Sequence, residues 1–397
     1  MHALTSSWRT KTLASTRLKA SELGTAVGVT RVTDITWLDR IGIPVYASIR
    51  PSAAVGSLCV CAGKGSVPEE ARVGAIMEAV EFALAESSPA RLRSFETSIA
   101  SVGEQEALRA PFVGFCPIWQ APIDSKSTLE VVSATDFESG DEIAVPAELV
   151  LLPYGKRRLF GVTSNGLCSG NTLHEALLHG LCELVERDIL AFNFFVDASA
   201  MVSDNDLPEC VLRLERQIHD AGMVLHLRAT RNSFGVPFFE AFIVADDGDP
   251  ISIARGSGVH PSRDVAAVRA ITEAAQSRLT YIHGARDDLT ERAKYFLSRE
   301  PDAERLETSR LLARISSRDH LINFVDVPSL PCDSIEGAID VLRQRLATNG
   351  LAQVLYVDLL PGYDTLRVLR VIVPGLESFN SRLHRIGRRL ANFISGA

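Results

Sequence analysis

Apolar side chains recur at helical spacing in two long segments of the chain, and a polar, glycine-containing loop precedes each of them. The first segment runs from about Pro68 to Glu86, and its apolar stripe consists of Val73, Ile76, Met77, Val80 and Leu84. The second begins after a helix cap at Asn171 or Thr172, and its stripe consists of Leu173, Ala176, Leu177, Leu181, Leu184 and Val185. This spacing predicts two amphipathic helices whose apolar faces lie on a core.

The rest of the chain alternates short β-rich runs with helical patterns. We expect strands at 45–49, 57–61, 224–228, 236–244, 352–358 and 369–373, and further helices at 207–221, 264–281 and 335–348. This alternation predicts an α/β (α+β) fold. A chain of 397 residues can form one large domain or two closely packed lobes. We expect a loose N-terminal arm at 1–22, and then a single domain at 23–397 with a charged helical excursion at about 289–315.

Composition and charge exclude several classes of protein. A net charge of −8 argues against a nucleic-acid binder, although basic residues gather at 382–390, where they would form the outer face of an amphipathic helix and hint at an anionic partner. No apolar run reaches the roughly 18–20 residues of a membrane span. The seven cysteines are scattered and contain no CxxC pair. They argue against a zinc site or a disulfide framework and favour a reducing, cytoplasmic location.

Paired glutamates occur on both predicted helices. Glu78 and Glu81 share one face of the first helix, and Glu183 and Glu186 share one face of the second, together with His179. A single pair of this kind usually belongs to a solvated face. Two pairs in matching contexts predict a Mg²⁺ site, because this cation prefers oxygen ligands and because four close carboxylates need a cation to stay ionised.

Groups that could contact phosphate accompany the glutamates. Lys64 lies in the loop AGKGS, which lacks the GxxxxGK[ST] spacing of a Walker A motif, and an exposed lysine in a strand-to-helix turn explains it equally well. Arg278 and Arg286 could clamp phosphoryl oxygens or form surface ion pairs. Backbone N–H groups of the loops at 164–171 and 254–258 could also bind phosphate. Magnesium, arginines and loop amides together are typical of phosphoryl transfer.

Two other chemistries compete with this interpretation. A carboxylate-bridged di-iron site would need Glu-x-x-His pairs, and neither EAVE nor ELVE supplies one. Cys182 could be a nucleophile, but its position on the apolar flank of a helix is typical of a buried structural cysteine.

The chain resembles the YcaO superfamily in four successive segments: GKGSVPEEARVGAIMEAVE, SNGLCSGNTLHEALLHGLCELVERD, RAITEAAQSR and VIVPGLES. The similarity covers about residues 30–380. The stretch GVTRVTDITWLDRIGIPVYASIRP is most similar to the subgroup that works beside TfuA-like proteins. The resemblance implies the YcaO fold, in which helices flank mixed β-sheets and an ATP site lies between them.

Members of this family use ATP, with Mg²⁺ held by glutamates, to phosphorylate the oxygen of a peptide backbone amide. A Cys, Ser or Thr side chain then attacks in azoline formation, or external sulfide attacks in thioamide formation. By resemblance, the catalytic carboxylates and metal ligands are Glu78, Glu81, Glu183 and Glu186. The nucleotide would be contacted by Lys64, Ser164, Asn165 and His179, with Arg278 as the preferred phosphate-binding and catalytic arginine and Arg286 as its alternative.

The chain departs from part of the family pattern. Many azoline-forming members end in a PxPxP tail, whereas this sequence ends in ANFISGA, which favours thioamide formation over an azoline-forming cyclodehydratase. A non-catalytic nucleotide-binding scaffold is a third alternative, and the retained glutamates argue against it. A TfuA-like or peptide-recognition protein would deliver the peptide or protein substrate, and family members are often homodimers. The ATP-directed N-terminal lysine and serine of some members could correspond to Lys19 and Ser21.

Overall fold

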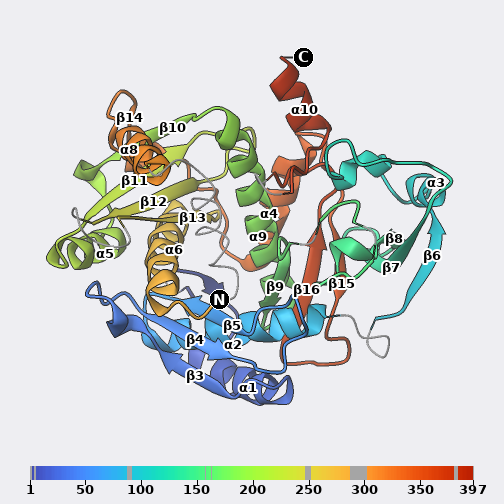
Figure 1. Cartoon of the computed structure of the whole chain (residues 1–397), viewed down its shortest axis with the longest axis horizontal. Coiled ribbons are helices and arrows are strands. Elements are labelled where there is room, and N and C mark those ends of the chain that lie inside the picture. The colour runs from blue at the N-terminus through green and yellow to red at the C-terminus, as the bar shows by residue number, and fades with distance from the viewer. Residues whose placement is uncertain are drawn as a thin grey trace.

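The computed structural model describes residues 2–3, 6–86, 92–156, 158–161, 163–245, 252–286, 302–379 and 383–396. Three β-sheets surround a central helix, α4 (Leu173–Phe195), and further helices pack against the sheets (Figure 1). Thr172 is the N-cap of α4, and its hydroxyl accepts a hydrogen bond from the Glu175 N–H at 3.2 Å. The predicted α/β architecture is confirmed.

The N-terminal part of the chain forms an antiparallel sheet in the order β3-β4-β5 (Arg31–Asp34, Val45–Ile49 and Val60–Lys64), so the strand expected at 57–61 starts later. Helices α1 (Leu13–Ala26) and α2 (Pro68–Ala85) pack against each other beside this sheet. A hairpin of β1 and β2 (His2–Ala3 and Trp8–Arg9) precedes α1. The described residues of the segment expected to be a loose arm at 1–22 instead form this hairpin and most of α1, because α1 buries Ala20 and Leu23 in a core that it shares with α2.

The two larger sheets combine strands from distant parts of the chain. One has the order β6-β7-β15-β16-β9 with β8 on β7, and its strands are Ser94–Ser98, Thr128–Asp136, Leu355–Asp358, Arg367–Ile372, Leu167–Gly170 and Glu142–Pro146. The other has the order β13-β12-β11-β10-β14, and its strands are Ile253–Val259, Phe238–Val244, Val224–Thr230, Ser199–Ser203 and Leu321–Asn323. Neighbouring strands are antiparallel apart from β10 and β14.

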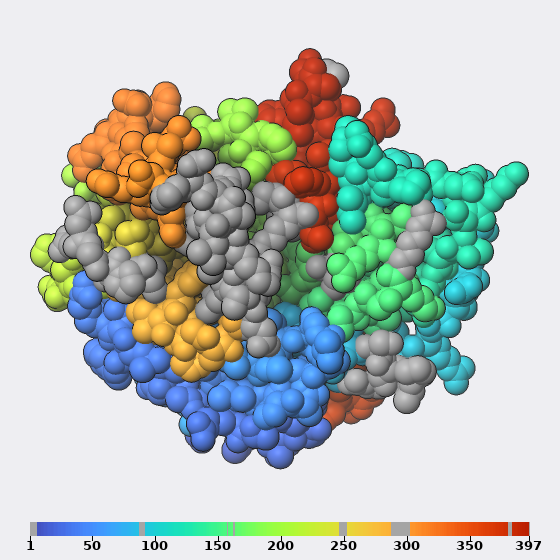
Figure 2. Space-filling view, viewed as in Figure 1, coloured from blue at the N-terminus to red at the C-terminus, as the bar shows by residue number. Residues whose placement is uncertain are grey.

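The remaining helices are α3 (Ile99–Gly103), α5 (Glu209–Asp220), α6 (Arg263–His283), α8 (Ala303–Ser316), α9 (Ile335–Ala347) and α10 (Arg388–Ser395). Helix α9 packs on α4, and α6 packs on β12 and β13. Of the helical excursion expected at 289–315, residues 289–301 lie outside the described residues, and the rest belongs to α8. Helix α10 stands out from the body of the molecule (Figures 1 and 2).

Three edge strands, β5, β9 and β13, face a common space, and three helices join them in pairs. Helix α2 contacts β5 and β9, α4 contacts β9 and β13, and α6 contacts β13 and β5. Each strand has a glycine where a helix backbone lies against it. A Cβ atom on Gly63 would lie 2.0 Å from Ala75 N, and one on Gly170 would lie 2.4 Å from Ala176 N. Gly256 approaches α6 in the same way.

The basic C-terminal segment turns inward. Arg385 donates to the carbonyl oxygens of Phe115 and Cys116, and Arg389 forms an ion pair with the buried Asp188 on α4. Arg382 lies outside the described residues. Arg385 and Arg389 belong to the basic segment that the sequence suggested for an anionic partner, and both are bonded within the protein instead. Among the described residues, no helix is both long enough and apolar enough to cross a membrane.

Replacing Gly63 with alanine tests the close approach of β5 to α2. Because the new Cβ would meet backbone atoms that cannot rotate away, we expect Gly63→Ala to lower the free energy of unfolding by about 1–3 kcal/mol. Thermal denaturation followed by circular dichroism measures the change. Gly155→Ala is the matched control, since its Cβ would meet nothing within 4 Å, and it should leave the transition in place. Equal transitions for both variants would contradict the packing argument.

Candidate active site

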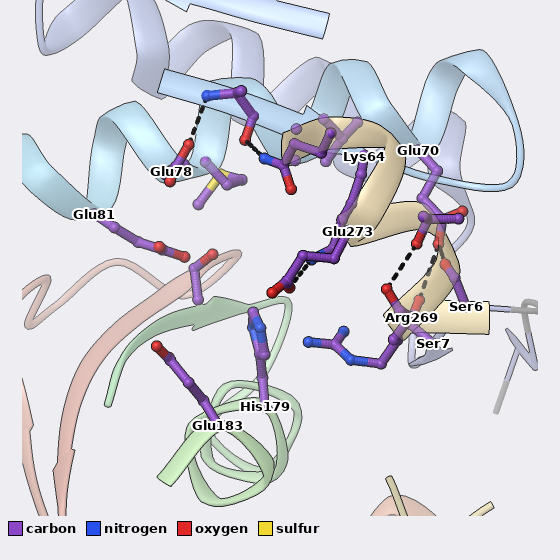
Figure 3. Close-up of a pocket in the computed structure, with 18 of the residues that line it drawn as sticks. Ser6, Ser7, Lys64, Glu70, Glu78, Glu81, His179, Glu183, Arg269 and Glu273 are labelled. Carbon is purple, nitrogen blue, oxygen red and sulfur yellow. Dashed lines mark hydrogen bonds and ion pairs between the residues drawn. The ribbon is translucent and has the colours of Figure 1, made fainter. Parts of the chain in front are cut away.

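A cavity of about 540 Å³ lies between the edge strands β5 and β9, and Ser257 of the third edge strand, β13, donates to Glu186 in its wall. The wall includes residues of β5, β9, α2, α4 and α6 and of the N-terminal segment that leads into α1. Segments far apart in sequence therefore meet at this site, as the close-up in Figure 3 shows for α2, α4 and α6. The predicted location of a site between the sheets agrees with this geometry.

Both predicted glutamate pairs line the cavity. Glu81 of α2 and Glu183 of α4 point toward one space from opposite walls (Figure 3). Each pair is also held by the protein: a carboxylate oxygen of Glu78 accepts from the Ala62 N–H at 2.6 Å, and one of Glu186 accepts from the Ser257 hydroxyl at 2.7 Å. Strand β5 therefore orients one pair and β13 the other.

Burial disfavours the ionised forms of one glutamate from each pair, Glu81 and Glu183. It raises the pKa of Glu81 to about 8, and the neighbouring charges of Glu78 and Glu183 act in the same direction. It raises the pKa of Glu183 to about 7, although Arg187 opposes the shift. Within the part of the chain that the structure describes, no three His, Cys, Asp or Glu side chains are already gathered around a metal position. This arrangement fits Mg²⁺, because a divalent cation would relieve the repulsion and draw the oxygen ligands together.

Basic side chains line the opposite part of the cavity. Lys64 of β5 forms an ion pair with Glu273 of α6, and Arg269 lies one turn before Glu273 on the same helix (Figure 3). Burial opposes ionisation of Glu273, but Lys64 and Arg187 together hold its pKa well below the usual carboxylate range. Arg187 follows Glu186 on α4 and also lines the cavity. Sequence patterns did not single out Glu273, Arg187 or Arg269 as residues of this part of the site.

The N-terminal segment closes one side of the cavity. Ser6 and Ser7 donate to the buried Glu70 at the start of α2. Arg9 forms an ion pair with Glu175 of α4 at 2.9 Å, and the Thr10 N–H and hydroxyl, together with Asn171, donate to the same carboxylate. Lys19 and Ser21 are not among the described residues of the cavity wall; Lys19 pairs with Glu22 on α1 at 2.9 Å.

The structure brings most of the predicted site residues together. Besides the four glutamates, the cavity wall includes Lys64, Ser164, His179 and Arg286. Burial and the charge of Arg269 hold the pKa of His179 well below its usual value, so its ring is neutral. Its buried Nδ1 atom finds no hydrogen-bond partner within the described residues, and a ligand could supply one.

Two predicted residues lie elsewhere. Asn165 lines a smaller neighbouring cavity, and its Nδ2 donates to the Ser378 hydroxyl at 3.1 Å. Arg278 is buried outside the cavity wall, with its Nε 2.8 Å from Asp39 Oδ2. The reason is helical phase: Arg278 follows Arg269 by nine residues, about two and a half turns, so the two face opposite sides of α6. The spacing of Arg269, Glu273 and Gln276 is the signal that would have identified the cavity face.

Comparison with known proteins decides the family. A family model described as the YcaO cyclodehydratase, ATP- and Mg²⁺-binding, matches residues 62–377. The chain belongs to the YcaO family. Its YcaO fold is also that of YcaO from Methanopyrus kandleri bound with AMPPCP and Mg²⁺, with a TM-score of 0.76, 25% identity and coverage of 98% of this chain and 97% of the other. The predicted family and its cofactors, ATP and Mg²⁺, are confirmed.

YcaO relatives cover almost the whole chain. A protein of Methanothermobacter thermautotrophicus is 38% identical over 383 residues, which are 93% of this chain and 94% of the relative. A protein of Rhizobium leguminosarum bv. trifolii, named for its position in the tfuA 3′ region, is 34% identical over 390 residues, with coverage of 93% and 89%. A heterocyclase in complex with substrate and cofactor shares the fold, with a TM-score of 0.78 and 21% identity.

The raised pKa of Glu81 makes stability and metal binding depend on pH. Because the folded-state pKa is about 8 and the ordinary value is 4.5, the metal-free protein should lose stability as pH rises through this window. Affinity for Mg²⁺ should rise over the same window, because protons compete with the metal. Calorimetric titration of Mg²⁺ at several pH values, with thermal denaturation, checks both trends. Glu81→Gln should make both trends shallower, leaving the part due to Glu183, and an unchanged pH profile in that variant would contradict this assignment.

Proposed function

We propose that this protein uses ATP and Mg²⁺ to phosphorylate a backbone amide oxygen of a peptide or protein, and that sulfide then converts the amide into a thioamide. One observation carries the proposal: two glutamate pairs from α2 and α4 share a cavity with several arginines and a lysine. Carboxylates that hold Mg²⁺ and cations that neutralise phosphoryl oxygens are the two requirements of phosphoryl transfer.

The glutamates and basic residues would have separate roles. Glu78, Glu81, Glu183 and Glu186 would hold Mg²⁺, which neutralises charge on the nucleotide phosphates. Arg187 and Arg269, with Arg286 and Lys64, would bind phosphoryl oxygens. Ser164 and the neutral His179 would contact the nucleotide. Arg278, which is paired with Asp39, would act only by holding α6 in place.

The reaction balances with sulfide as the second reactant. The amide oxygen attacks the γ-phosphoryl group of ATP, and ADP leaves. Hydrosulfide then adds to the activated amide carbon, the C–O bond breaks, and the oxygen leaves as inorganic phosphate. The product retains sulfur in place of oxygen, so the side chains of the cavity need only orient the reactants and balance charge.

Two observations favour thioamide formation with a separate partner protein. A relative that is 34% identical is named for the tfuA 3′ region, and the segment 28–51 resembles the TfuA-associated subgroup. A TfuA-like protein would therefore deliver the substrate or the sulfur. Azoline formation is the second candidate, because the family model is named for cyclodehydratases. A scaffold without activity would not need a cavity with two glutamate pairs.

Removal of one carboxylate tests the metal assignment. Glu183→Gln keeps the volume of the side chain but removes its charge, so we expect affinity for Mg²⁺–AMPPCP to fall by about 10- to 100-fold. Isothermal titration calorimetry measures the change. The control is Glu336→Gln, since this exposed side chain on α9 lies outside the cavity wall. If Glu183→Gln binds as tightly as the control, Glu183 is not a metal ligand.

Mass spectrometry of a modified peptide distinguishes the products. Incubation with ATP, Mg²⁺, sulfide and the TfuA-like partner should replace one oxygen of the substrate peptide with sulfur. Loss of water without sulfur would identify azoline formation. An unchanged peptide and no release of phosphate, with a protein that binds ATP, would contradict thioamide formation and favour a scaffold.

A further inference from the structure

A buried arginine lies beneath the loop that presents Ser164 to the cavity. Arg370 belongs to β16, is 1% exposed and is not among the described residues of the cavity wall. Its Nη1 donates to the carbonyl oxygens of Thr163 at 3.1 Å and Asn165 at 3.0 Å, and its Nη2 donates to that of Val150 at 3.1 Å. Both terminal nitrogens are thus bonded to the backbone, which fixes the guanidinium in one orientation.

The next residue of β16 holds the same loop. The Val371 N–H donates to the Gly166 carbonyl at 2.7 Å, and the Leu167 N–H closes the turn by donating to the Ser164 carbonyl at 2.8 Å. Gly166 has a φ of +80°, and a Cβ atom there would lie 2.3 Å from the Val371 carbonyl oxygen. The loop that places Ser164 in the cavity therefore takes its shape from β16, and Arg370 supplies two of the bonds that hold it, those to Thr163 and Asn165.

The charge of Arg370 also acts on the carboxylates. Burial lowers its pKa to about 10, and the nearby charges of Glu183 and Glu81 oppose this shift. The group is therefore still protonated near neutral pH. Arg370 is also among the charges that counteract the raised pKa of Glu183. Such an interaction is strong in a buried site, because little water screens it.

We propose that Arg370 is a positioning residue with two separable effects on ligand binding. The N–H donors of its guanidinium keep the loop at 163–165 in the conformation that binds the nucleotide. Its fixed positive charge competes with a divalent cation at the carboxylates, so the empty cavity binds metal weakly and the metal enters together with the negatively charged nucleotide. This inference rests on the proposed function, in which Glu81 and Glu183 hold Mg²⁺.

Two substitutions separate the effect of the positive charge of Arg370 from the effect of its paired hydrogen-bond donors. Arg370→Met removes both, and Arg370→Lys keeps the charge but loses the paired donors. We expect Arg370→Met to bind Mn²⁺ alone about tenfold more tightly than the wild type, and Arg370→Lys to bind it with unchanged affinity. Both variants should bind Mg²⁺–AMPPCP about tenfold more weakly. Electron paramagnetic resonance of free Mn²⁺ and isothermal titration calorimetry give the two affinities without any assay of activity.

Arg367 supplies matched controls on the same strand. It pairs with Asp358 at 3.1 Å near the surface, so Arg367→Met and Arg367→Lys should change neither affinity. The proposal is overturned if Arg370→Met does not tighten Mn²⁺ binding, or if Arg370→Lys binds nucleotide like the wild type. Should Arg370→Met fail to fold, the lysine variant still decides through its nucleotide affinity. A wild-type protein that does not bind Mg²⁺–AMPPCP would refute the proposed function, while the Mn²⁺ titrations would still test the charge effect.

Discussion

Repulsion among buried carboxylates is the constraint on which the rest of the site depends. Glu81 and Glu183 face each other across the cavity, and burial makes their ionised forms costly. Among the basic groups nearby, Arg187 pairs with Glu186, Lys64 pairs with Glu273, and Arg370 is bonded to the backbone. Protonation or a cation from solution balances the remaining negative charge, which ties metal binding to the electrostatics of the fold.

The architecture explains how so many charges can be brought to one place. Two of the three sheets line the cavity with their edge strands, β5 and β9, and the third contributes Ser257 of β13, which donates to Glu186. Each of these edge strands is covered by a helix whose backbone approaches a glycine. Helices α2, α4 and α6 carry charged residues on the faces that line the cavity. Each of these helices contacts strands of two different sheets. A displacement of any one sheet would therefore shift two walls of the cavity at once.

Local periodicity predicted the part of the site that lies on single helices. The pairs Glu78 and Glu81, and Glu183 and Glu186, were recognisable because three residues along a helix return a side chain to the same face. By the same criterion Arg278 lies outside the cavity wall, since its phase on α6 is opposite to that of Arg269. The family resemblance, in contrast, named the fold and cofactors correctly because long ordered blocks are specific to a family.

Contacts between distant segments were beyond the reach of sequence patterns. Nothing near Arg9 indicates that it meets Glu175, which lies 166 positions further along the chain. Likewise, Asn165 and Ser164 are neighbours in one polar loop, and only the left-handed backbone at Gly166 and the bonds from β16 decide which of them faces the cavity. Sequence patterns also do not predict that an arginine such as Arg370 is buried, because it lies within an ordinary strand pattern.

The position of the two chain ends has a practical meaning for handling this protein. Residues 6–10 are bonded to both α2 and α4 at the cavity, whereas α10 points away from the body of the molecule (Figure 1). An affinity tag or fluorescent fusion at the N-terminus would lie close to the segment that closes one side of the cavity. The same addition after α10 would lie away from this segment, so the C-terminus is the better attachment point for purification, surface immobilisation and labelled binding assays.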